Sequence, residues 1–280
     1  MFEVIIASFG YAGAILCDKV VLSKYKVPVM RFLPLMFLFL AAITAPFLLR
    51  WGTFPDYSAL LTPFYISIFI LMIVVAIIWN ILYARGIQKE DLHEFELIML
   101  LTPLVTVIFA TIFLPAERNW EIFIPGLIAA IALLATRFRS HHVRIGAVAW
   151  RTILAMILMS FESILIKELL NVFSPVTLYF IRTLFIAAAF AILYRPKILS
   201  INRDAFAMII LSAMFGVTQM VLKFIGFKSL GVIETTMILV LGPILVYGAS
   251  AALFKEKLYK RDLFAAVTVV LCILYVEFWR

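Results

Sequence analysis

Charged residues are scarce in this chain of 280 residues: Asp, Glu, Lys and Arg make up 14% of it, and 65% is hydrophobic. A soluble domain is about one quarter charged. The chain also has apolar runs of about twenty residues, whereas a soluble helix carries polar side chains along its outer face. The shortage of charge therefore excludes an ordinary soluble domain, and lipid is the expected solvent.

The residues that support catalysis or cross-linking are also few. Both cysteines, Cys17 and Cys272, lie inside apolar runs, so we interpret them as small buried hydrophobes and not as a disulfide. The three histidines, His93, His141 and His142, lie in or beside loops. Because neither a nucleophile with its base, nor a metal-ligand spacing, nor a Gly-rich phosphate loop is recognisable, we expect no catalytic residue, no metal site, no cofactor and no ATP-driven step.

The formal charge of +8 raises the question of nucleic acid. The Lys and Arg residues form short clusters between apolar runs instead of one basic face, so orientation in the membrane explains them better. Most lie in the odd-numbered connections, which places those connections in the cytoplasm and both termini outside. The expected partners are membrane lipid and a small-molecule substrate, with no nucleic acid, and the chain is either a monomer or a homodimer.

Apolar runs long enough to cross a bilayer recur along the whole chain. A transmembrane helix needs about 20 residues, and short connections containing Pro, Gly or Lys separate the runs and leave no room for a soluble domain. Lipid requires each segment to satisfy its own backbone, which excludes a barrel and predicts an all-α integral membrane protein of ten transmembrane helices. The predicted spans are 2–22, 28–50, 61–84, 95–114, 120–138, 146–170, 175–195, 205–227, 232–254 and 260–279.

An internal repeat becomes visible when the chain is shifted by 140 residues. Leu-Thr-Pro-Leu at 101–104 then aligns with Leu-Gly-Pro-Ile at 241–244, and Glu94 aligns with Glu234. With five spans in each half, the second copy enters the membrane inverted. Inverted repeats are typical of secondary transporters, which hold the solute near the midplane between the halves. We therefore predict two five-helix units, 1–140 and 141–280.

The second half contains further motifs in a recognisable order. Pro175 follows Ser174 and precedes Arg182 by seven residues, Ser-Leu-Gly at 229–231 leads to the Pro243 motif, and Glu256 precedes the final span. The first half shows Thr-Pro-Leu at 102–104 and Glu117. In this order and spacing the chain resembles EamA-type members of the drug/metabolite transporter superfamily.

The resemblance implies ten helices in two bundled halves, a central cavity, and export or exchange of small metabolites. It also implies that both termini lie inside, opposite to the charge count. The first half departs more from the pattern, since Arg31 follows Pro28 by only three residues and Glu117 is not preceded by Gly. The resemblance names no particular substrate.

Glu162 is the deepest carboxyl group in the predicted spans. It lies eight residues from the end of its span, about 12 Å from that surface. An ionised carboxylate is costly there, so a protonatable Glu162 could couple proton movement to transport. The structural alternative is a carboxyl group hydrogen-bonded to a neighbouring helix, with Ser160 and Ser163 as nearby polar residues.

Other polar residues in the spans are candidates for a cavity wall. Arg182 could bind an anionic solute, reach the headgroups or pair with a carboxylate. Trp79, Asn80 and Tyr83 form a polar aromatic stripe, and the shift of 140 residues aligns Trp79 with Gln219 and Tyr83 with Lys223. An interfacial aromatic belt is the alternative for this stripe. Charged pairs near span ends, such as Asp18 with Lys19 and Lys223 with Glu234, are interpreted as interface anchors.

Two prolines complete the set of candidates. Pro103 and Pro243 are expected at mid-span, where a missing backbone hydrogen bond would bend the helix and form a hinge or gate. The function predicted from all these features is a multi-pass secondary transporter of small organic metabolites in the cytoplasmic membrane, an exporter or exchanger, with proton coupling as a hypothesis. A channel and a nucleotide-sugar-type antiporter are alternatives, and a membrane-embedded enzyme is disfavoured.

Overall fold

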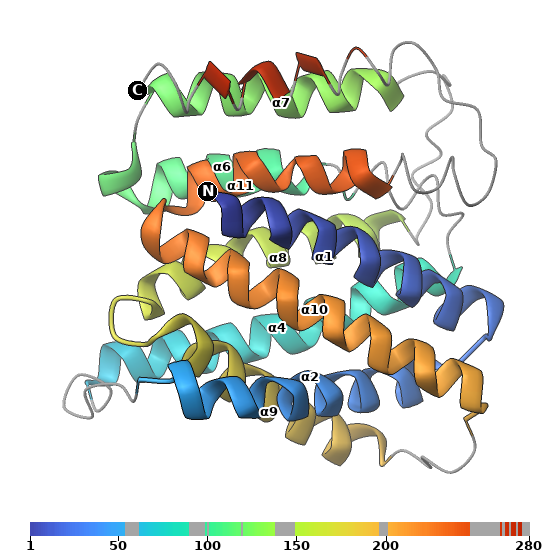
Figure 1. Cartoon of the computed structure of the whole chain (residues 1–280). Helices are drawn as coiled ribbons and strands as arrows, with labels where there is room; N and C mark the ends of the chain where they lie inside the picture. The colour runs from blue at the N-terminus through green and yellow to red at the C-terminus, as the bar shows by residue number, and fades with distance from the viewer. Residues whose placement is uncertain are drawn as a thin grey trace.

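The computed structural model describes residues 1–53, 62–89, 99, 101–118, 120–137, 149–195 and 201–246, and eight positions between 264 and 275. Within these residues all regular structure is helical (Figure 1). Each α-helix matches a predicted span to within a few residues at most ends. The helices are α1 (Phe2–Lys19), α2 (Val29–Trp51), α4 (Pro63–Lys89), α6 (Thr102–Phe113), α7 (Trp120–Arg137), α8 (Ala149–Leu169), α9 (Pro175–Tyr194), α10 (Arg203–Ser229) and α11 (Val232–Leu239).

Several spans extend differently from the prediction: α4 continues to Lys89 instead of ending at residue 84, and α11 ends at Leu239 although its span was expected to reach residue 254. A π-helical turn, Val20–Lys24, carries α1 beyond the predicted end at Leu22. The helix containing α6 was expected from residue 95, but α6 begins at Thr102, and residues 90–98 lie outside the described part. The last predicted span, 260–279, contains only isolated described positions.

The helix ends follow the local sequence chemistry. Ser174 caps α9 by accepting a hydrogen bond from the backbone N–H of Thr177 at 3.3 Å, and Pro175 occupies the first turn, where no N–H is needed. Asn202 caps α10 in the same way through the N–H of Asp204, at 3.2 Å. These caps keep the connections between spans short.

The outer surface confirms a membrane protein. Among the described residues, five helices are long and apolar enough to cross a bilayer by length and composition: Phe2–Lys24, Val29–Trp51, Pro63–Gln88, Pro175–Tyr194 and Arg203–Ser229. Large apolar side chains point outward from them, with Leu49 92% and Ile192 74% exposed. Such a surface is stable only against lipid. The protein is therefore a multi-pass helical membrane protein.

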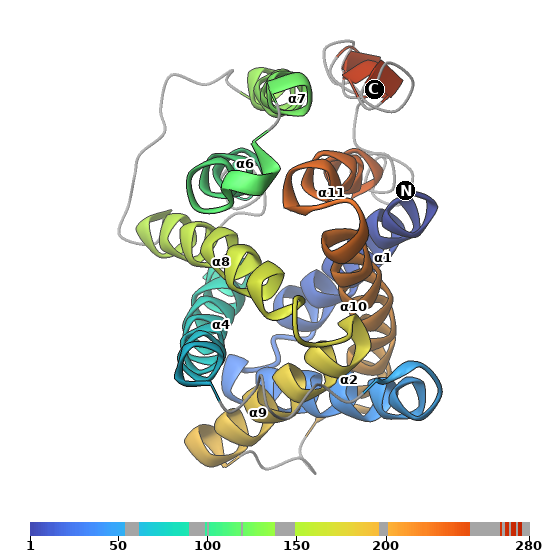
Figure 2. The ribbon, with the colours of Figure 1, turned by 90° about the vertical axis from the view of Figure 1, so that its left-hand side faces the viewer.

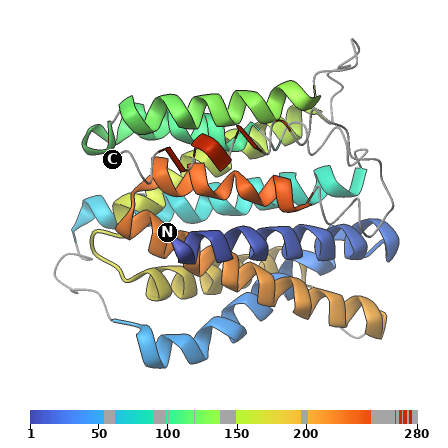
Figure 3. The same cartoon turned by 45° about the horizontal axis from the view of Figure 1, so that its top comes forward.

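The helices run roughly along one direction (Figures 1 and 3) and surround a common centre (Figure 2). Helix α1 packs along α10 on one side, and α4 packs along α8 on the opposite side. Helices α2 and α9 contact each other across one end of this arrangement, and α6 contacts α11 across the other. Each of these pairs joins a helix from residues 1–140 to one from residues 141–280, so the two halves interleave.

The α1 and α10 backbones approach closely at Gly10. A Cβ atom at this position would lie 2.9 Å from both the backbone N of Gln219 and the backbone O of Phe215. Only glycine therefore permits this spacing without a shift of one helix, as is common where membrane helices pack on small residues. The contact holds α1 and α10 close together.

Candidate functional site

A cavity of about 200 Å³ lies at the centre of the helices. Eight of the described helices contribute to its wall, α7 being the exception. Four ionisable side chains, Asp18, Glu162, Arg182 and Lys223, are among the lining residues, and most of the remainder are methionine, aromatic or aliphatic. The full lining is Tyr11, Ala14, Ile15, Asp18, Met36, Phe37, Leu40, Trp79, Asn80, Tyr83, Met99, Thr102, Pro103, Thr106, Met159, Glu162, Tyr179, Arg182, Gly216, Gln219, Met220, Lys223, Thr236, Leu239 and Pro243.

The sequence predicted nine residues for the wall or the gate of a cavity, and all nine are among the lining residues of this cavity. They come from helices far apart in the chain and include both members of each pair related by the shift of 140 residues. The predicted residues that the structure brings together are Trp79, Asn80, Tyr83, Pro103, Glu162, Arg182, Gln219, Lys223 and Pro243. Their common location is a structural finding, and their role in binding stays a prediction.

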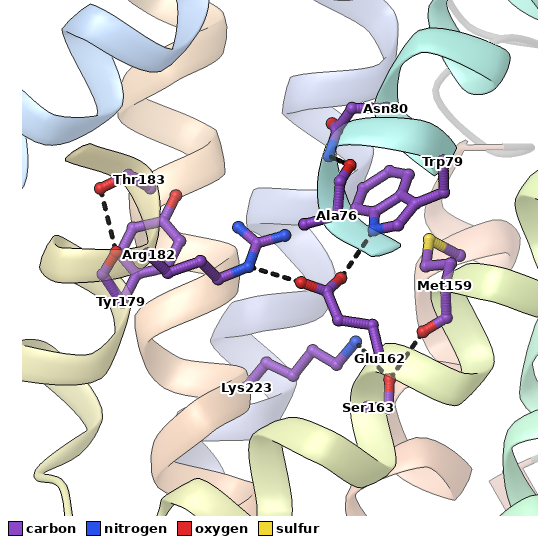
Figure 4. A network of polar contacts seen from close by, with 10 residues as sticks. All are labelled: Ala76, Trp79, Asn80, Met159, Glu162, Ser163, Tyr179, Arg182, Thr183 and Lys223. Atoms are coloured by element: carbon purple, nitrogen blue, oxygen red, sulfur yellow. Dashed lines mark hydrogen bonds and ion pairs between the residues drawn. The ribbon is translucent and has the colours of Figure 1, made fainter. Parts of the chain in front are cut away.

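Glu162 is the centre of a buried polar network (Figure 4). Its Oε1 accepts a hydrogen bond from Arg182 Nε at 2.6 Å, and its Oε2 accepts one from Trp79 Nε1 at 2.7 Å. The side chains of Glu162 and Arg182 are each only 2% exposed. This is a buried ion pair, and each charge there compensates the desolvation of the other.

The network bears on both interpretations of Glu162. The sequence left open a protonatable coupling site and a structural carboxyl group hydrogen-bonded to a neighbouring helix, and the structure shows Glu162 hydrogen-bonded to Arg182 of α9 and Trp79 of α4. The nearby serines bond elsewhere, Ser160 to the carbonyl of Thr102 at 3.3 Å and Ser163 to the carbonyl of Met159 at 3.2 Å. Arg182 therefore pairs with a carboxylate, and its burial excludes the alternative that it extends to the headgroups.

Lys223 of α10 approaches the same network from the other side (Figure 4). Its Nζ is 3.4 Å from Ser163 Oγ and 5.0 Å from the centre of the Phe227 ring. The expectation that Lys223 anchors the interface beside Glu234 is therefore wrong, because the side chain points toward α8 and lines the cavity. Asn80 uses its amide nitrogen locally, donating to the carbonyl of Ala76 at 2.8 Å.

Three buried polar atoms of the wall have no hydrogen-bond partner within the part of the chain that the structure describes. They are Arg182 Nη2, the Tyr179 hydroxyl and Thr102 Oγ1. Tyr179 is only 1% exposed. The sequence analysis missed Tyr179 and Thr102, although Tyr179 precedes Arg182 by three residues and so shares its helix face.

Asp18 is a further cavity residue that the sequence analysis misplaced. It was interpreted as an interface anchor with Lys19, but it is 8% exposed, lines the cavity and accepts a hydrogen bond from Ser212 Oγ. The π-helical turn Val20–Lys24 explains the error, because it extends the helix and places Asp18 deeper than its distance from Pro28 suggests.

The two prolines lie beside breaks in their helices. Pro103 occupies the first turn of α6, so its expected mid-helix position is wrong. Pro243 follows a turn at Val240 that ends α11. Pro103 removes no hydrogen bond from α6, because the first turn needs no N–H donor. Pro243 leaves the carbonyl of Leu239, four residues earlier, without its helical partner, and Leu239 also lines the cavity.

Glu117 links the two halves away from the cavity. Its Oε2 accepts hydrogen bonds from the backbone N–H groups of Val232 at 2.7 Å and Ile233 at 3.3 Å, at the beginning of α11. Its Oε1 lies 3.2 Å from Lys167 Nζ. Gly231 has φ +92°, so its conformation favours glycine, and it directs α11 toward this carboxylate.

Known proteins resemble part of this sequence and share the fold of this chain. Residues 144–278 match the EamA-like transporter family. A protein of known crystal structure shares the fold with a TM-score of 0.74 at 17% sequence identity, and the match covers 98% of this chain and 95% of that one. No curated protein matches the sequence significantly.

Proposed function

We propose that the protein is a secondary transporter that exports or exchanges small organic solutes across the cytoplasmic membrane, because residues 144–278 match the EamA-like transporter family. One observation carries the proposal: a cavity lined by eight helices, most of them of membrane-spanning length, holds the ionisable side chains of Asp18, Glu162, Arg182 and Lys223. Such side chains are costly in hydrocarbon and mark solute or ion pathways.

The size and lining of the cavity support a small solute. Its volume of about 200 Å³ is below the roughly 300–1,000 Å³ of pockets for drug-sized ligands. An apolar wall with a few converging polar groups is the usual composition of a small-molecule site. Solutes of modest size with an apolar part fit this description better than bulky polar ones.

The symmetry of the helices supports alternating access. Helices α4 and α10 are both 27 residues long and begin and end 140 residues apart. Trp79 and Gln219, and Tyr83 and Lys223, thus occupy equal positions in the two helices, and all four line the cavity. The same pairing relates α1 to α8 as it relates α4 to α10. The contact of α1 with α10 therefore corresponds to the contact of α8 with α4. These features are expected of two inverted copies, 1–140 and 141–280, that rock around a central site.

Proton coupling through Glu162 requires a change of partner during the cycle. In the described state Arg182 and Trp79 each donate a hydrogen bond to one oxygen of the carboxylate. Protonation would accompany a state in which α8 and α9 separate and the ion pair opens. The coupling hypothesis is therefore tied to movement between these two helices.

Transport by purified protein in proteoliposomes tests the function. We expect uptake of at least one solute from a panel of small metabolites to saturate and to show counterflow, the acceleration of labelled uptake by unlabelled solute inside. Empty liposomes and an Ile192→Ala variant, altered on the lipid-facing surface, are the controls. Flux that rises linearly with concentration without counterflow would indicate a channel, and no flux of any solute would contradict transport.

A further inference from the structure

We propose that the cavity recognises its solute as an organic carboxylate, which accepts hydrogen bonds from Arg182 Nη2 and the Tyr179 hydroxyl and balances the positive charge of Lys223. The inference rests on the proposed transport function and names its solute class: small monocarboxylates with an apolar body and no ammonium group.

The first argument is the set of donors without acceptors. Arg182 Nη2 and the Tyr179 hydroxyl are buried, line the cavity and have no hydrogen-bond partner among the described residues. Arg182 and Tyr179 lie three residues apart on α9, so both side chains are on one face of the helix. Buried donors are nearly always satisfied, and a ligand oxygen in the cavity would satisfy both.

The second argument is the local charge balance. Glu162 forms an ion pair with one of the two cations, Arg182, whereas the Nζ of Lys223 contacts the Ser163 hydroxyl and the Phe227 ring. Among the described residues, Lys223 forms no ion pair. One positive charge is left over, which a single anionic group of the solute would balance. Guanidinium and ammonium groups are the usual partners of such anions.

The local charges disfavour an ammonium group next to the carboxylate of the solute. Glu162 is already paired with Arg182 and accepts a further hydrogen bond from Trp79, so its negative charge is compensated. The other acidic group of the cavity, Asp18, accepts a hydrogen bond from Ser212. Ser212 precedes Lys223 on α10 by eleven residues, which corresponds to about 16 Å along the helix. An α-amino acid bound at Lys223 would therefore bring a cation to a site that already has an excess of positive charge.

The remaining wall suits the rest of such a solute. Met36, Met99, Met159, Met220, Phe37 and Leu40 line the cavity. Flexible thioether side chains adapt to apolar groups of different shape. The donors at one end and this apolar lining together describe a site for an amphiphilic acid.

Binding to the purified full-length protein in nanodiscs tests the solute class. The probes are three acid and amide pairs of increasing size, acetate with acetamide, butyrate with butanamide, and 3-phenylpropionate with its amide, and also L-phenylalanine. We expect at least one acid to bind about tenfold more tightly than its amide, and 3-phenylpropionate to bind more tightly than phenylalanine. Equal binding of all acids and amides, no binding by any acid, or tighter binding of phenylalanine would overturn the proposal.

Variants then assign the binding to these side chains. Lys223→Met and Tyr179→Phe should each weaken binding of the preferred acid about tenfold and leave its amide unchanged. Lys228→Met on α10 and Tyr194→Phe on α9 repeat the same substitutions on the same helices outside the cavity and should bind the acid normally. Unchanged acid binding in both cavity variants contradicts the assignment. If saturable counterflow persists with a solute that is not an acid, the solute class fails while the transport function stands; absence of all flux refutes both.

Discussion

Replacing Glu162 with Gln should strongly destabilise the protein, because it removes one partner of a buried ion pair. Arg182 would stay 2% exposed with no counter-charge. Breaking a buried pair from one side costs about 3–5 kcal/mol, whereas solvent-screened pairs contribute much less. The Gln oxygen can still accept the hydrogen bond from Trp79, so most of the loss comes from the unpaired guanidinium. We expect a decrease of about 3–5 kcal/mol in the free energy of unfolding.

Unfolding by a graded increase of denaturing detergent, followed by tryptophan fluorescence, measures this change. The double variant Glu162→Gln with Arg182→Met removes both charges and should recover most of the lost stability, since replacing a whole buried pair is often neutral. Glu3→Gln, at an exposed position near the N-terminus, is the matched control and should unfold like the wild type. A Glu162→Gln protein within about 1 kcal/mol of the wild type, or a double variant less stable than the single one, would refute the reasoning.

Three further predictions concern transport and packing. In proteoliposomes normalised for folded protein, Glu162→Gln should abolish the accumulation of solute driven by a proton gradient, while downhill exchange of the solute persists. Continued accumulation of solute against its gradient would show that Glu162 is not the coupling residue. Gly10→Ala should lower the free energy of unfolding by about 1–3 kcal/mol, because its Cβ would meet backbone atoms of α10 at 2.9 Å. Gly126→Ala, where the added Cβ has no atom within 4 Å, should leave the free energy of unfolding unchanged. Equal effects of the two substitutions would contradict the close packing. Pro243→Ala should slow counterflow without reducing insertion, by restoring a backbone hydrogen bond beside the cavity, and a normal rate would exclude a gating role for Pro243.

The spans were predictable because the length and hydropathy of a helix in lipid are set locally. The helix α10, for example, was expected over 205–227 and is found over Arg203–Ser229. The candidate cavity residues were identified because polar side chains in apolar segments are rare and therefore conspicuous, as with Glu162 and Trp79. Both features depend only on the sequence within one helix.

The partners within the site were not predictable, because they depend on how the helices pack. Glu162 is separated from Arg182 by 20 residues and from Trp79 by 83, and no helical periodicity relates such positions. The depth of Asp18 depended on a π-helical turn that the residue pattern does not specify. The position of Pro103 depended on where α6 begins, which hydropathy defines only to within several residues.

The pairing of α1 with α10 has a consequence for how the protein is made. Asp18 and Ser212 are separated by 194 residues, so the first helix leaves the ribosome long before its hydrogen-bond partner exists. At roughly 5–20 residues per second, this interval lasts about 10–40 seconds. During that time the carboxyl group of Asp18 and the bare backbone at Gly10 have no α10 to cover them. The nascent first helix must therefore be held by the insertion machinery or by lipid headgroups until the second half arrives, and a ribosome pause before Arg203 would prolong that exposure.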